Sequence, residues 1–356
     1  MGKLSSSTIA ARRDAARDWV LSECFYRRIT LSEKFLESAM GSAIFPKLYF
    51  YIKHYKKLPK EILLDAEKFH NTRPYEVTDG ENAWLLKTWQ YLNQIGVTCE
   101  LVDDIPDSGI LFYTYENFPY NQKPNKNLFL VYVKGDKPPH PYANLMLIQS
   151  TYEQLSYPKA HFIPLWPQPG LKPRAIERED KFENIAYLGT HGSLTDDFKT
   201  LNWKEKVAEL GLNWTIRSQP SEWAEYTDID AVLAVRSFAA RTGGEYTKSQ
   251  GKWKPATKLY NSWLAGVVPI LGNEPAFREL RQSELDYMEV NSLEETLEIL
   301  MRLKEDSQLR KAIFANARHR CHEFSVDGIA QKWSDFIHQT AIPMWQNWHQ
   351  KSSIHR

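Results

Sequence analysis

The stretch KPATKLYNSWLAGVVPILG, residues 254–272, contains a helical pattern that passes directly into a strand pattern. At 3.6 residues per turn, Lys254, Lys258 and Asn261 fall on one face, and the large apolar side chains fall on another. Pro255 suits the first turn of a helix because its missing N–H has no intrahelical partner there. The final VVPIL is an apolar run of strand length. The stretch therefore predicts a helix that begins near Lys254 and a buried strand after it.

The start of this predicted helix is unusually basic. A helix N-terminus carries partial positive charge, so lysines there are unfavourable unless an anion is bound. Between positions 236 and 258 the only acid is Glu245, and the basic residues are Arg236, Arg241, Lys248, Lys252, Lys254 and Lys258. Arg236 ends the apolar run DAVLAV, so we expect it at the carboxyl edge of a strand, where open α/β sheets bind ligands. A solvated basic loop is the alternative, but the strand-edge arginine favours a phosphate site.

Length and composition predict a soluble α/β protein of two domains. The chain has 356 residues, more than one domain usually contains. Hydrophobic residues make up 42% and charged residues 25%, as in ordinary globular proteins. The net charge is +1, which disfavours nucleic acid as a partner. Three cysteines and the lack of a signal-peptide pattern or of a long apolar run predict a cytoplasmic protein.

Short apolar runs of four to six residues alternate with helical segments after residue 70, a pattern typical of parallel α/β sheets. A proline-rich segment interrupts this alternation and predicts a linker. The aromatic segment at the end of the sequence predicts a helix kinked at Pro343. The predicted parts are a helical extension over 1–70, a Rossmann-like domain over 71–165, the linker over 166–180, a second Rossmann-like domain over 181–330 and the closing helix over 331–356.

Residues 254–280, KPATKLYNSWLAGVVPILGNEPAFREL, resemble the nucleotide-sugar segment of bacterial GT-B glycosyltransferases of families 1 and 4. In that family a helix before an A-x-G-x-P step holds the diphosphate and ribose of the donor. AWLLKTWQYLNQIG, residues 83–96, resembles the acceptor-side domain, and the closing helix resembles the one that crosses back onto that domain. The resemblance implies a GT-B fold, with two Rossmann-like domains facing across a cleft, and transfer of a hexose from a nucleotide-diphosphate sugar.

The candidate donor-binding residues lie in the second domain and are Gly189, Thr190, Arg236, Lys254, Thr257, Lys258, Asn261 and Glu274. For Gly189 a plain turn, and for Glu274 a helix-opening acid, are the alternatives. Many retaining members of the family have two glutamates eight positions apart, and this chain has Trp253 and Asn261 there, so the stereochemical outcome stays open. The lysine-rich segment also has some likeness to fucosyltransferases, which implies an inverting reaction from a GDP-sugar. Both UDP and GDP are therefore candidate nucleotides.

The chemistry of transfer requires charge that stabilises the leaving diphosphate. Arg236, Lys254 and Lys258 can supply that charge, so we expect no metal and no cofactor besides the nucleotide sugar.

An inverting reaction also needs a base that deprotonates the acceptor hydroxyl. Asp79, in VTDGEN, is the first candidate, and Asp136 and His140, in KGDKPPHPY, are rivals. The structural alternatives are a helix-start or turn role for Asp79 and a loop role for His140.

Residues 45–60, FPKLYFYIKHYKKLPK, contain five lysines, five aromatic residues and no acid. As a helix, this segment aligns Phe45, Leu48, Ile52 and Tyr55 in one stripe, which can rest on an anionic membrane surface that holds a lipid-linked acceptor. A helix packed on the N-terminal domain, with its lysines reaching solvent, is the alternative.

Three functions fit these patterns. The first is a glycosyltransferase that acts on a glycan or glycolipid acceptor, as in polysaccharide biosynthesis. The second is a sugar-nucleotide epimerase, which shares the fold, and the third is a glycan- or nucleotide-binding module without turnover. A dehydrogenase is disfavoured, because no Gly-x-Gly-x-x-Gly follows a predicted strand.

Overall fold

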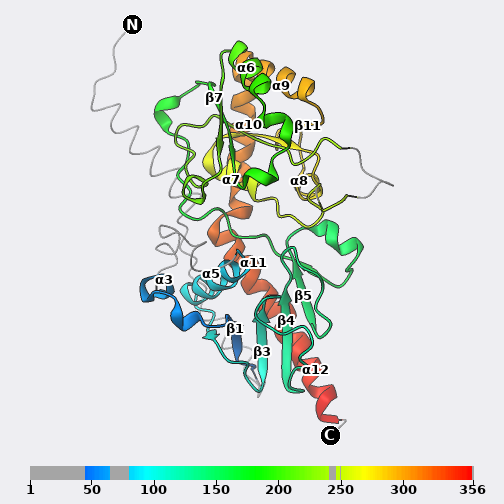
Figure 1. Ribbon diagram of the computed structural model, residues 1–356. Coiled ribbons are helices and arrows are strands. Elements are labelled where there is room, and N and C mark those ends of the chain that lie inside the picture. Colours follow the sequence, from blue (N-terminus) through cyan, green and yellow to red (C-terminus); the bar gives the residue numbers. More distant parts are fainter. Residues whose placement is uncertain (1–44, 65–79, 240–245, 249, 355–356) are drawn as a thin grey trace, which may run out of the picture. The chain divides into compact units, whose positions relative to one another are not determined.

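The computed structural model describes residues 45–64, 80–239, 246–248 and 250–354. These residues form two compact units, each with its own parallel sheet (Figure 1). Among them, unit 1 contains the residues in 171–251 and 257–328, and unit 2 contains those up to 170, in 252–256 and from 329 onward. The two parallel α/β sheets confirm the predicted fold class of two Rossmann-like domains, as in the GT-B fold.

Unit 1 has a five-stranded sheet in the order β11-β10-β9-β7-β8. Its strands are β7 (Asn184–Leu188), β8 (Asn213–Arg217), β9 (Ala231–Ala234), β10 (Val268–Gly272) and β11 (Met288–Val290). All pairs are parallel, so the five carboxyl ends lie at one edge. The chain order reverses between β7 and β9, and such a switch point is where open sheets bind ligands.

The helices of unit 1 follow the strands in alternation. They are α6 (Leu201–Glu209), α7 (Thr257–Ala265), α8 (Pro275–Leu280), α9 (Leu293–Glu305) and α10 (Ser307–Arg320). The side chains of Thr200, Ser292 and Asp306 accept hydrogen bonds from backbone N–H groups in the first turns of α6, α9 and α10. Each cap satisfies a donor that the helix leaves unpaired.

Helix α7 begins at Thr257, so the predicted start near Lys254 is wrong by three residues. The residue before a proline is driven out of the helical region by the proline ring, which excludes Lys254 from the helix. Residues 252–256 belong to unit 2, whereas α7 belongs to unit 1. Lys254 and Lys258 therefore do not share a helix face.

Helix α7 ends at Ala265, and the residue after it is a glycine. Gly266 has a φ of 68°, which favours glycine. Its N–H donates to the Trp263 carbonyl at 3.2 Å, and the Val267 N–H donates to the Ser262 carbonyl at 3.0 Å. These two bonds form a Schellman motif, which ends the helix and directs the chain into β10.

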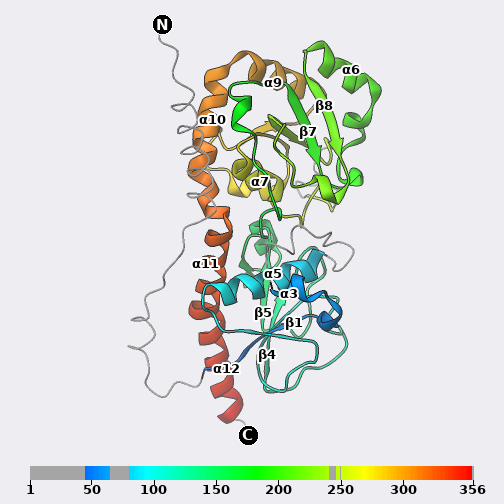
Figure 2. The ribbon, with the colours of Figure 1, turned by 90° about the vertical axis from the view of Figure 1, so that its left-hand side faces the viewer.

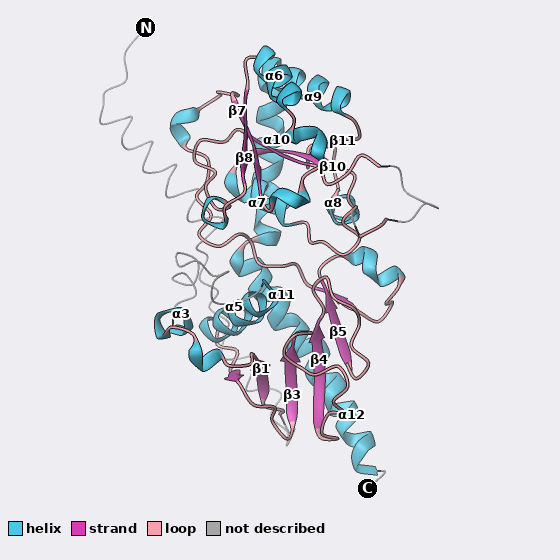
Figure 3. Ribbon diagram, in the orientation of Figure 1, coloured by secondary structure: helices cyan, strands magenta, loops and turns pink. Residues whose placement is uncertain are grey.

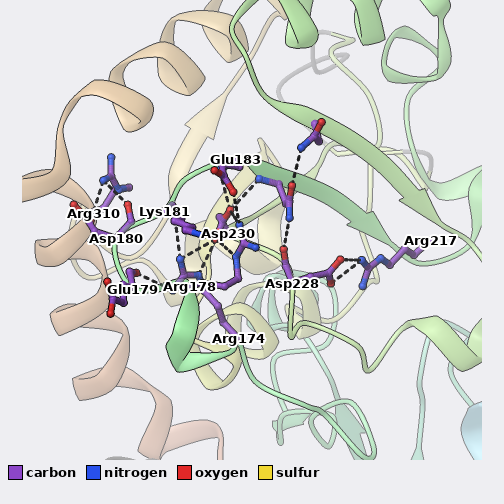
Figure 4. A network of polar contacts seen from close by, with 12 residues as sticks. Arg174, Arg178, Glu179, Asp180, Lys181, Glu183, Arg217, Asp228, Asp230 and Arg310 are labelled. Atoms are coloured by element: carbon purple, nitrogen blue, oxygen red, sulfur yellow. Dashed lines mark hydrogen bonds and ion pairs between the residues drawn. The ribbon is translucent and has the colours of Figure 1, made fainter. Parts of the chain in front are cut away.

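Asp230, directly before β9, is fully buried and is bonded by two arginines. Its carboxylate accepts hydrogen bonds from Arg174 at 2.9 Å and from Arg178 at 2.8 and 2.6 Å (Figure 4). The backbone N–H groups of Glu183 and Asn184 add two more at 2.8 and 2.9 Å. Much of the predicted linker is thus fixed on unit 1, whose described residues begin at 171.

Unit 2 has a six-stranded parallel sheet in the order β2-β1-β3-β4-β5-β6. Its strands are β1 (Leu48–Tyr51), β2 (Glu100–Val102), β3 (Gly109–Tyr113), β4 (Leu128–Val133), β5 (Leu145–Ile148) and β6 (His161–Phe162). The apolar runs predicted as strands in 98–148 form β2 to β5. The chain order reverses between β1 and β3, so unit 2 has a switch point of its own.

Strand β1 corrects the prediction of a helix over residues 45–60. LYFY lies inside the sheet, between β2 and β3, and is followed by a short 3-10 helix, η1 (Tyr55–Lys57). Three of the four residues of β1 are buried, because the run packs on both faces of the sheet. The sheet of unit 2 therefore begins inside the segment that was predicted as a helical extension.

Helices cover one face of the unit 2 sheet. They are α5 (Gly80–Gln94), α11 (Val326–Phe336) and α12 (Ile342–Ile354) (Figure 2). The short helix α3 (Lys60–Leu64) packs on α5, where Nε2 of Gln90 donates to the Ile62 carbonyl. The ring of Trp333, on α11, lies 6.4 Å from that of Phe50, 6.0 Å from that of Phe112 and 6.5 Å from that of Trp84, on α5. On α12, Trp348 contacts Phe129. Residues of β1, β3 and β4 that point to this face thus pack against helices.

The opposite face of the same sheet is covered by coil. Its buried cluster contains Tyr51, Leu111, Tyr113, Phe118, Leu128, Leu130 and Tyr132. In the described part of the chain, the other residues packed against this cluster come from strands and from the connections 103–108, 114–127 and 134–144. The connections after β3 and β4 contain no described helix (Figure 3). We call this the coil-covered face.

The closing helix is interrupted by a π-helix, η9 (Ile337–Ala341), between α11 and α12. Pro343 is the second residue of α12 and has no N–H to donate to the preceding turn. A local π-helix is a common response to such a missing bond. The irregularity therefore lies just before the proline, close to the predicted kink.

Several predictions fall on residues outside the described ranges. These are the helices expected before residue 45 and the candidate base Asp79. Within the described residues, no helix has both the length and the apolar character needed to cross a membrane.

Candidate active site

The candidate site lies at the carboxyl edge of the unit 1 sheet, at the switch point between β7 and β9. Gly189 directly follows β7. One residue separates Arg236 from the end of β9, and one residue separates Glu274 from the end of β10. The three strands are neighbours in the sheet, so the topology brings these residues to one place. Lys258 joins them from the first turn of α7.

The ammonium of Lys258 lies directly against Gly189. A Cβ atom at Gly189 would be 2.8 Å from Nζ of Lys258 and 3.0 Å from Oη of Tyr187. Gly189 also has a φ of 147°, which side chains other than hydrogen rarely allow. The backbone turn after β7 and the lysine can approach this closely only because residue 189 is glycine.

The side chain of Tyr187, near the end of β7, contacts both the Lys258 ammonium and the turn that contains Gly189. Nζ of Lys258 lies 5.1 Å from the centroid of its ring, within the range of a cation–π interaction. Its hydroxyl donates to the carbonyl of Thr190 at 3.0 Å, which closes the turn. Burial, the largest influence, raises the pKa of Tyr187 to about 12, so the phenol stays protonated. Arg236 has the opposite influence on this pKa.

Arg236 is held by Glu274. Its Nε donates to Oε2 of Glu274 at 2.9 Å, and the glutamate is only 5% exposed. A Cβ atom at Gly251 would be 2.5 Å from the same carboxylate oxygen, so the loop before α7 also reaches this pair. A guanidinium has five N–H donors, and the bond to Glu274 uses one of them. Glu274 therefore orients an arginine at the edge of the sheet.

Three further residues that were predicted to bind the nucleotide sugar differ in how deeply they are buried. Thr190 is exposed beside Gly189, and Thr257 is half-buried as the first residue of α7. Asn261 is buried one turn further along α7, and its side chain is bonded to the hydroxyl of Tyr226. The geometry thus places Thr190 and Thr257 at the edge and Asn261 in the packing between α7 and the sheet.

The position of α7 is fixed by a buried network at its far end. Nε1 of Trp263 donates to the carbonyl of Asp286 at 2.8 Å. The guanidinium of Arg320 lies 4.7 Å from the Trp263 ring centroid and binds the carboxylate of Asp286 at 2.7 Å. Both Arg320 and Asp286 are buried. The helix that carries Lys258 is therefore rigidly anchored in unit 1.

Lys254 and Asp136 form an ion pair in unit 2. Lys254 was predicted beside Lys258 at the donor phosphates, and Asp136 was predicted as a base. Both side chains are about one-third exposed, at 32% and 31%. The structure thus joins a predicted donor lysine to a predicted catalytic carboxylate.

Trp253, next to this pair, is packed on a buried lysine. The ammonium of Lys134, after β4, lies 4.8 Å from the Trp253 ring centroid and 2.5 Å from Oε2 of Glu153. Both side chains of this ion pair are fully buried. Nε2 of Gln149, after β5, donates to the Trp253 carbonyl at 2.9 Å. Trp253 thus belongs to the packing of unit 2.

His140 is buried among aromatic rings on the coil-covered face. The nearest rings are those of Tyr113, Phe118, Tyr120, Tyr132 and Tyr142, with centroids 5.1 to 6.1 Å away. Burial lowers the pKa of His140, against a smaller opposite influence from the nearby Pro119 carbonyl. The imidazole is therefore neutral at neutral pH, and its surroundings agree with the structural alternative for this residue.

No group of three or more histidine, cysteine, aspartate or glutamate side chains among the described residues is arranged to hold a metal ion. The sequence contains an Asp-x-Asp triplet at 228–230. Asp228 binds Arg217, and Asp230 binds Arg174 and Arg178, all at the amino end of β9 (Figure 4). These carboxylates are thus engaged at the edge opposite the candidate site.

Two residues of the site were missed in the sequence. Tyr187 was not singled out, although a buried aromatic residue two positions before a strand-end glycine is a detectable signal. The contact of Gly251 with Glu274 was not predicted either. The φ of 83° at Gly251 and its proximity to Glu274 require a residue without a side chain. No periodicity signals this second contact, because the residues are far apart in the sequence.

Comparisons with known proteins give similarity at the level of structure. No family model and no curated protein matches the chain significantly. The HepE structure from Anabaena with UDP and glucose has 14% identity over 82% of this chain and 99% of HepE, with a TM-score of 0.47. Sucrose-phosphate synthase from Thermosynechococcus elongatus has 10% identity over 83% and 98%, with a TM-score of 0.49. TarM has 11% identity over 71% and 58%, with a TM-score of 0.44.

Proposed function

We propose that this chain is a glycosyltransferase that moves a hexose from a nucleotide-diphosphate sugar to a glycan or glycolipid acceptor. The donor diphosphate would bind at the carboxyl edge of the unit 1 sheet, against Gly189, Lys258 and Arg236. The observation that carries the proposal is the contact of the Lys258 ammonium with Gly189 at the switch point.

Three physical features of this edge support a diphosphate as the ligand. The ammonium and the guanidinium bring two positive charges to the ends of adjacent strands, and phosphate oxygens accept from both. Gly189 lets backbone atoms approach a phosphate without a side chain between them. The first turn of α7 adds partial positive charge at the same place.

The proposed chemistry follows from the same charges. As the bond between sugar and phosphate oxygen breaks, negative charge grows on the leaving diphosphate, and the pre-oriented Lys258 and Arg236 stabilise it. Glu274 contributes by holding Arg236 in place. Asp79 and Asp136 stay the candidate bases for an inverting reaction.

The test is calorimetric titration of the full chain with UDP, GDP, ADP and dTDP. We expect one nucleoside diphosphate to bind, and Lys258→Ala to weaken that binding by about 2 kcal/mol, or about thirtyfold, since the ammonium bonds a charged group. Lys204→Ala, which removes an exposed lysine of α6 in the same unit, is the matched control and should bind like the wild type.

The products distinguish this function from its alternatives. Incubation with the matching nucleotide sugar should release nucleoside diphosphate slowly, by hydrolysis in place of transfer. Conversion to an isomeric nucleotide sugar would instead indicate an epimerase, and binding without any product would indicate a binding module. If no nucleoside diphosphate binds, or if Lys258→Ala binds as tightly as the wild type, the proposal is wrong.

Other features stay predictions. They are the identity of the hexose and the base, independence of metal ions, a role in polysaccharide biosynthesis and a cytoplasmic location. Contact of residues 45–60 with a membrane also stays a prediction. It now depends on the exposed lysines around η1, because this segment is not the predicted amphipathic helix.

A further inference from the structure

Two tyrosines expose their rings on the coil-covered face of unit 2. Tyr120 is 46% exposed and Tyr142 is 38% exposed, and they come from different connections, one after β3 and one after β4. Their centroids lie 5.6 and 6.1 Å from that of His140, so the two rings flank the same imidazole. Among the described residues of these two connections, no other large apolar side chain is exposed.

The rings packed beneath Tyr120 and Tyr142 are buried and hold the two tyrosines in place. His140 is 5% exposed and contacts the buried rings of Tyr113 and Phe118. The hydroxyl of Tyr132 donates to the carbonyl of Pro138 at 2.8 Å, which fixes the connection that carries Tyr142. A surface held in this way loses little conformational freedom when a ligand binds.

The same row of rings reaches the carboxyl edge of the unit 2 sheet. Tyr115, just after β3, has its centroid 6.2 Å from that of Tyr120. Lys137, after β4, lies 5.9 Å from the Tyr115 ring centroid and binds Glu116 at 2.7 Å. Lys137 directly follows Asp136, the candidate base, in the sequence.

We propose that Tyr120 and Tyr142 form a stacking subsite for uncharged pyranose rings of an oligosaccharide acceptor. Exposed aromatic rings with a polar hydroxyl suit a sugar, whose C–H face packs on a ring while its hydroxyls bond at the rim. The ion pair of Lys137 with Glu116 leaves that part of the row without net charge, which favours an uncharged ligand. The subsite deepens the proposed function, on which its role as an acceptor site rests.

The test measures binding and needs no enzymatic activity. The full chain is titrated with maltohexaose, cellohexaose, laminarihexaose and chitohexaose, with ligand-observed NMR as the readout. We expect at least one hexasaccharide to bind at concentrations of about 10 mM or below, as for a surface subsite. Tyr120→Ala/Tyr142→Ala should weaken this binding by about tenfold or more, because two stacked rings are lost.

Tyr120→Phe/Tyr142→Phe is the matched control. It retains both rings and should bind within about threefold of the wild type, as near-equal stacking predicts. The subsite is wrong if no hexasaccharide binds the wild type, or if the double alanine variant binds as the wild type does.

The affinity of the alanine variant for the nucleoside diphosphate separates this inference from the proposed function. That affinity should not change, because both tyrosines lie in unit 2 and the donor site lies in unit 1. A wild type that binds a nucleotide but no hexasaccharide would overturn the subsite alone. A wild type that binds a hexasaccharide but no nucleotide would overturn the donor site and leave the subsite as a glycan-binding surface.

Discussion

The ammonium of Lys258 rests on the ring of Tyr187, with Nζ 5.1 Å from the ring centroid. Tyr187 is fully buried at the end of β7, so the ring cannot turn away from this position. The lysine is therefore held before any ligand arrives, and little of its side-chain entropy remains to be lost on binding.

Tyr187→Leu should weaken nucleoside diphosphate binding. Removal of a partly desolvated cation–π interaction costs about 1–2 kcal/mol, which corresponds to about 5- to 30-fold in Kd. Tyr187→Phe keeps the ring and loses the hydrogen bonds of the hydroxyl, which involve Thr190 and Ser193, so its Kd should stay closer to that of the wild type. Calorimetry of both variants measures the difference. Equal losses in the two would assign the effect to the hydroxyl and contradict the role of the ring.

Gly189→Ala should displace Lys258. The added methyl group would lie 2.8 Å from Nζ, which is too close for any real contact, and the backbone there is unfavourable for alanine. We expect a loss of nucleotide affinity similar to that of Lys258→Ala. Gly192→Ala is the matched control, because a Cβ atom at Gly192 would meet nothing within 4 Å. A Gly189→Ala variant with wild-type affinity would remove the turn after β7 from the site.

Asp230 should make the stability of unit 1 sensitive to acid. Burial, the largest single influence, raises its pKa, but the bonds from Arg178 and from the Asn184 and Glu183 N–H groups, with the charge of Arg174, outweigh it and lower the pKa overall. Because the folded pKa lies below the ordinary value of about 3.9, this stabilisation is present above about pH 4 and is lost as the pH falls through the folded pKa.

Asp230→Asn tests this assignment. It leaves two mostly buried guanidinium groups without their carboxylate, so we expect a loss of about 3 kcal/mol or more in the free energy of unfolding at pH 7. The acid-induced loss of unfolding free energy between pH 5 and pH 3 should be smaller than in the wild type, because the titrating carboxylate is gone. Urea unfolding at several pH values measures both. Asp196→Asn, at a 98% exposed carboxylate of the same unit, should leave the midpoint unchanged.

Glu153→Gln should destabilise unit 2 more than removal of both charges does. The fully buried ion pair of Lys134 and Glu153 is costly to desolvate, and loss of one partner leaves a buried charge, at about 3–5 kcal/mol. In Lys134→Met/Glu153→Leu no charge remains, so the cost should be smaller. Thermal unfolding of the single and double variants compares them. A double variant less stable than Glu153→Gln would show that the pair itself is strongly stabilising.

Much of the fold could be predicted because parallel strands buried on both faces have a simple signature. The runs GILFYT, LFLVYV, NIAYLG and DAVLAVR all form strands. The stretch 254–272 was predicted as helix and strand, and Gly266 ends the helix by a local motif. These features depend on neighbours in the sequence, which the sequence itself displays.

Features that depend on distant contacts were harder to predict. LYFY in β1 carries lysines on both sides, and only its place between β2 and β3 makes it a strand. Lys254 appeared to continue the helix of Lys258, but the following proline and the pairing with Asp136 separate the two. Arg236 and Gly189 were predicted at strand ends, and the topology places them at one edge because a parallel sheet brings all carboxyl ends together.

The coil-covered face of unit 2 can change in sequence more easily than the face that packs against helices. Coil tolerates insertions and replacements far better than a helix packed into a core does. Substitutions around Tyr120 and Tyr142 can therefore reshape this surface while Trp333 and its neighbours keep the other side of the sheet unchanged. Under the proposed function, changes in these two loops would alter which saccharides this surface binds.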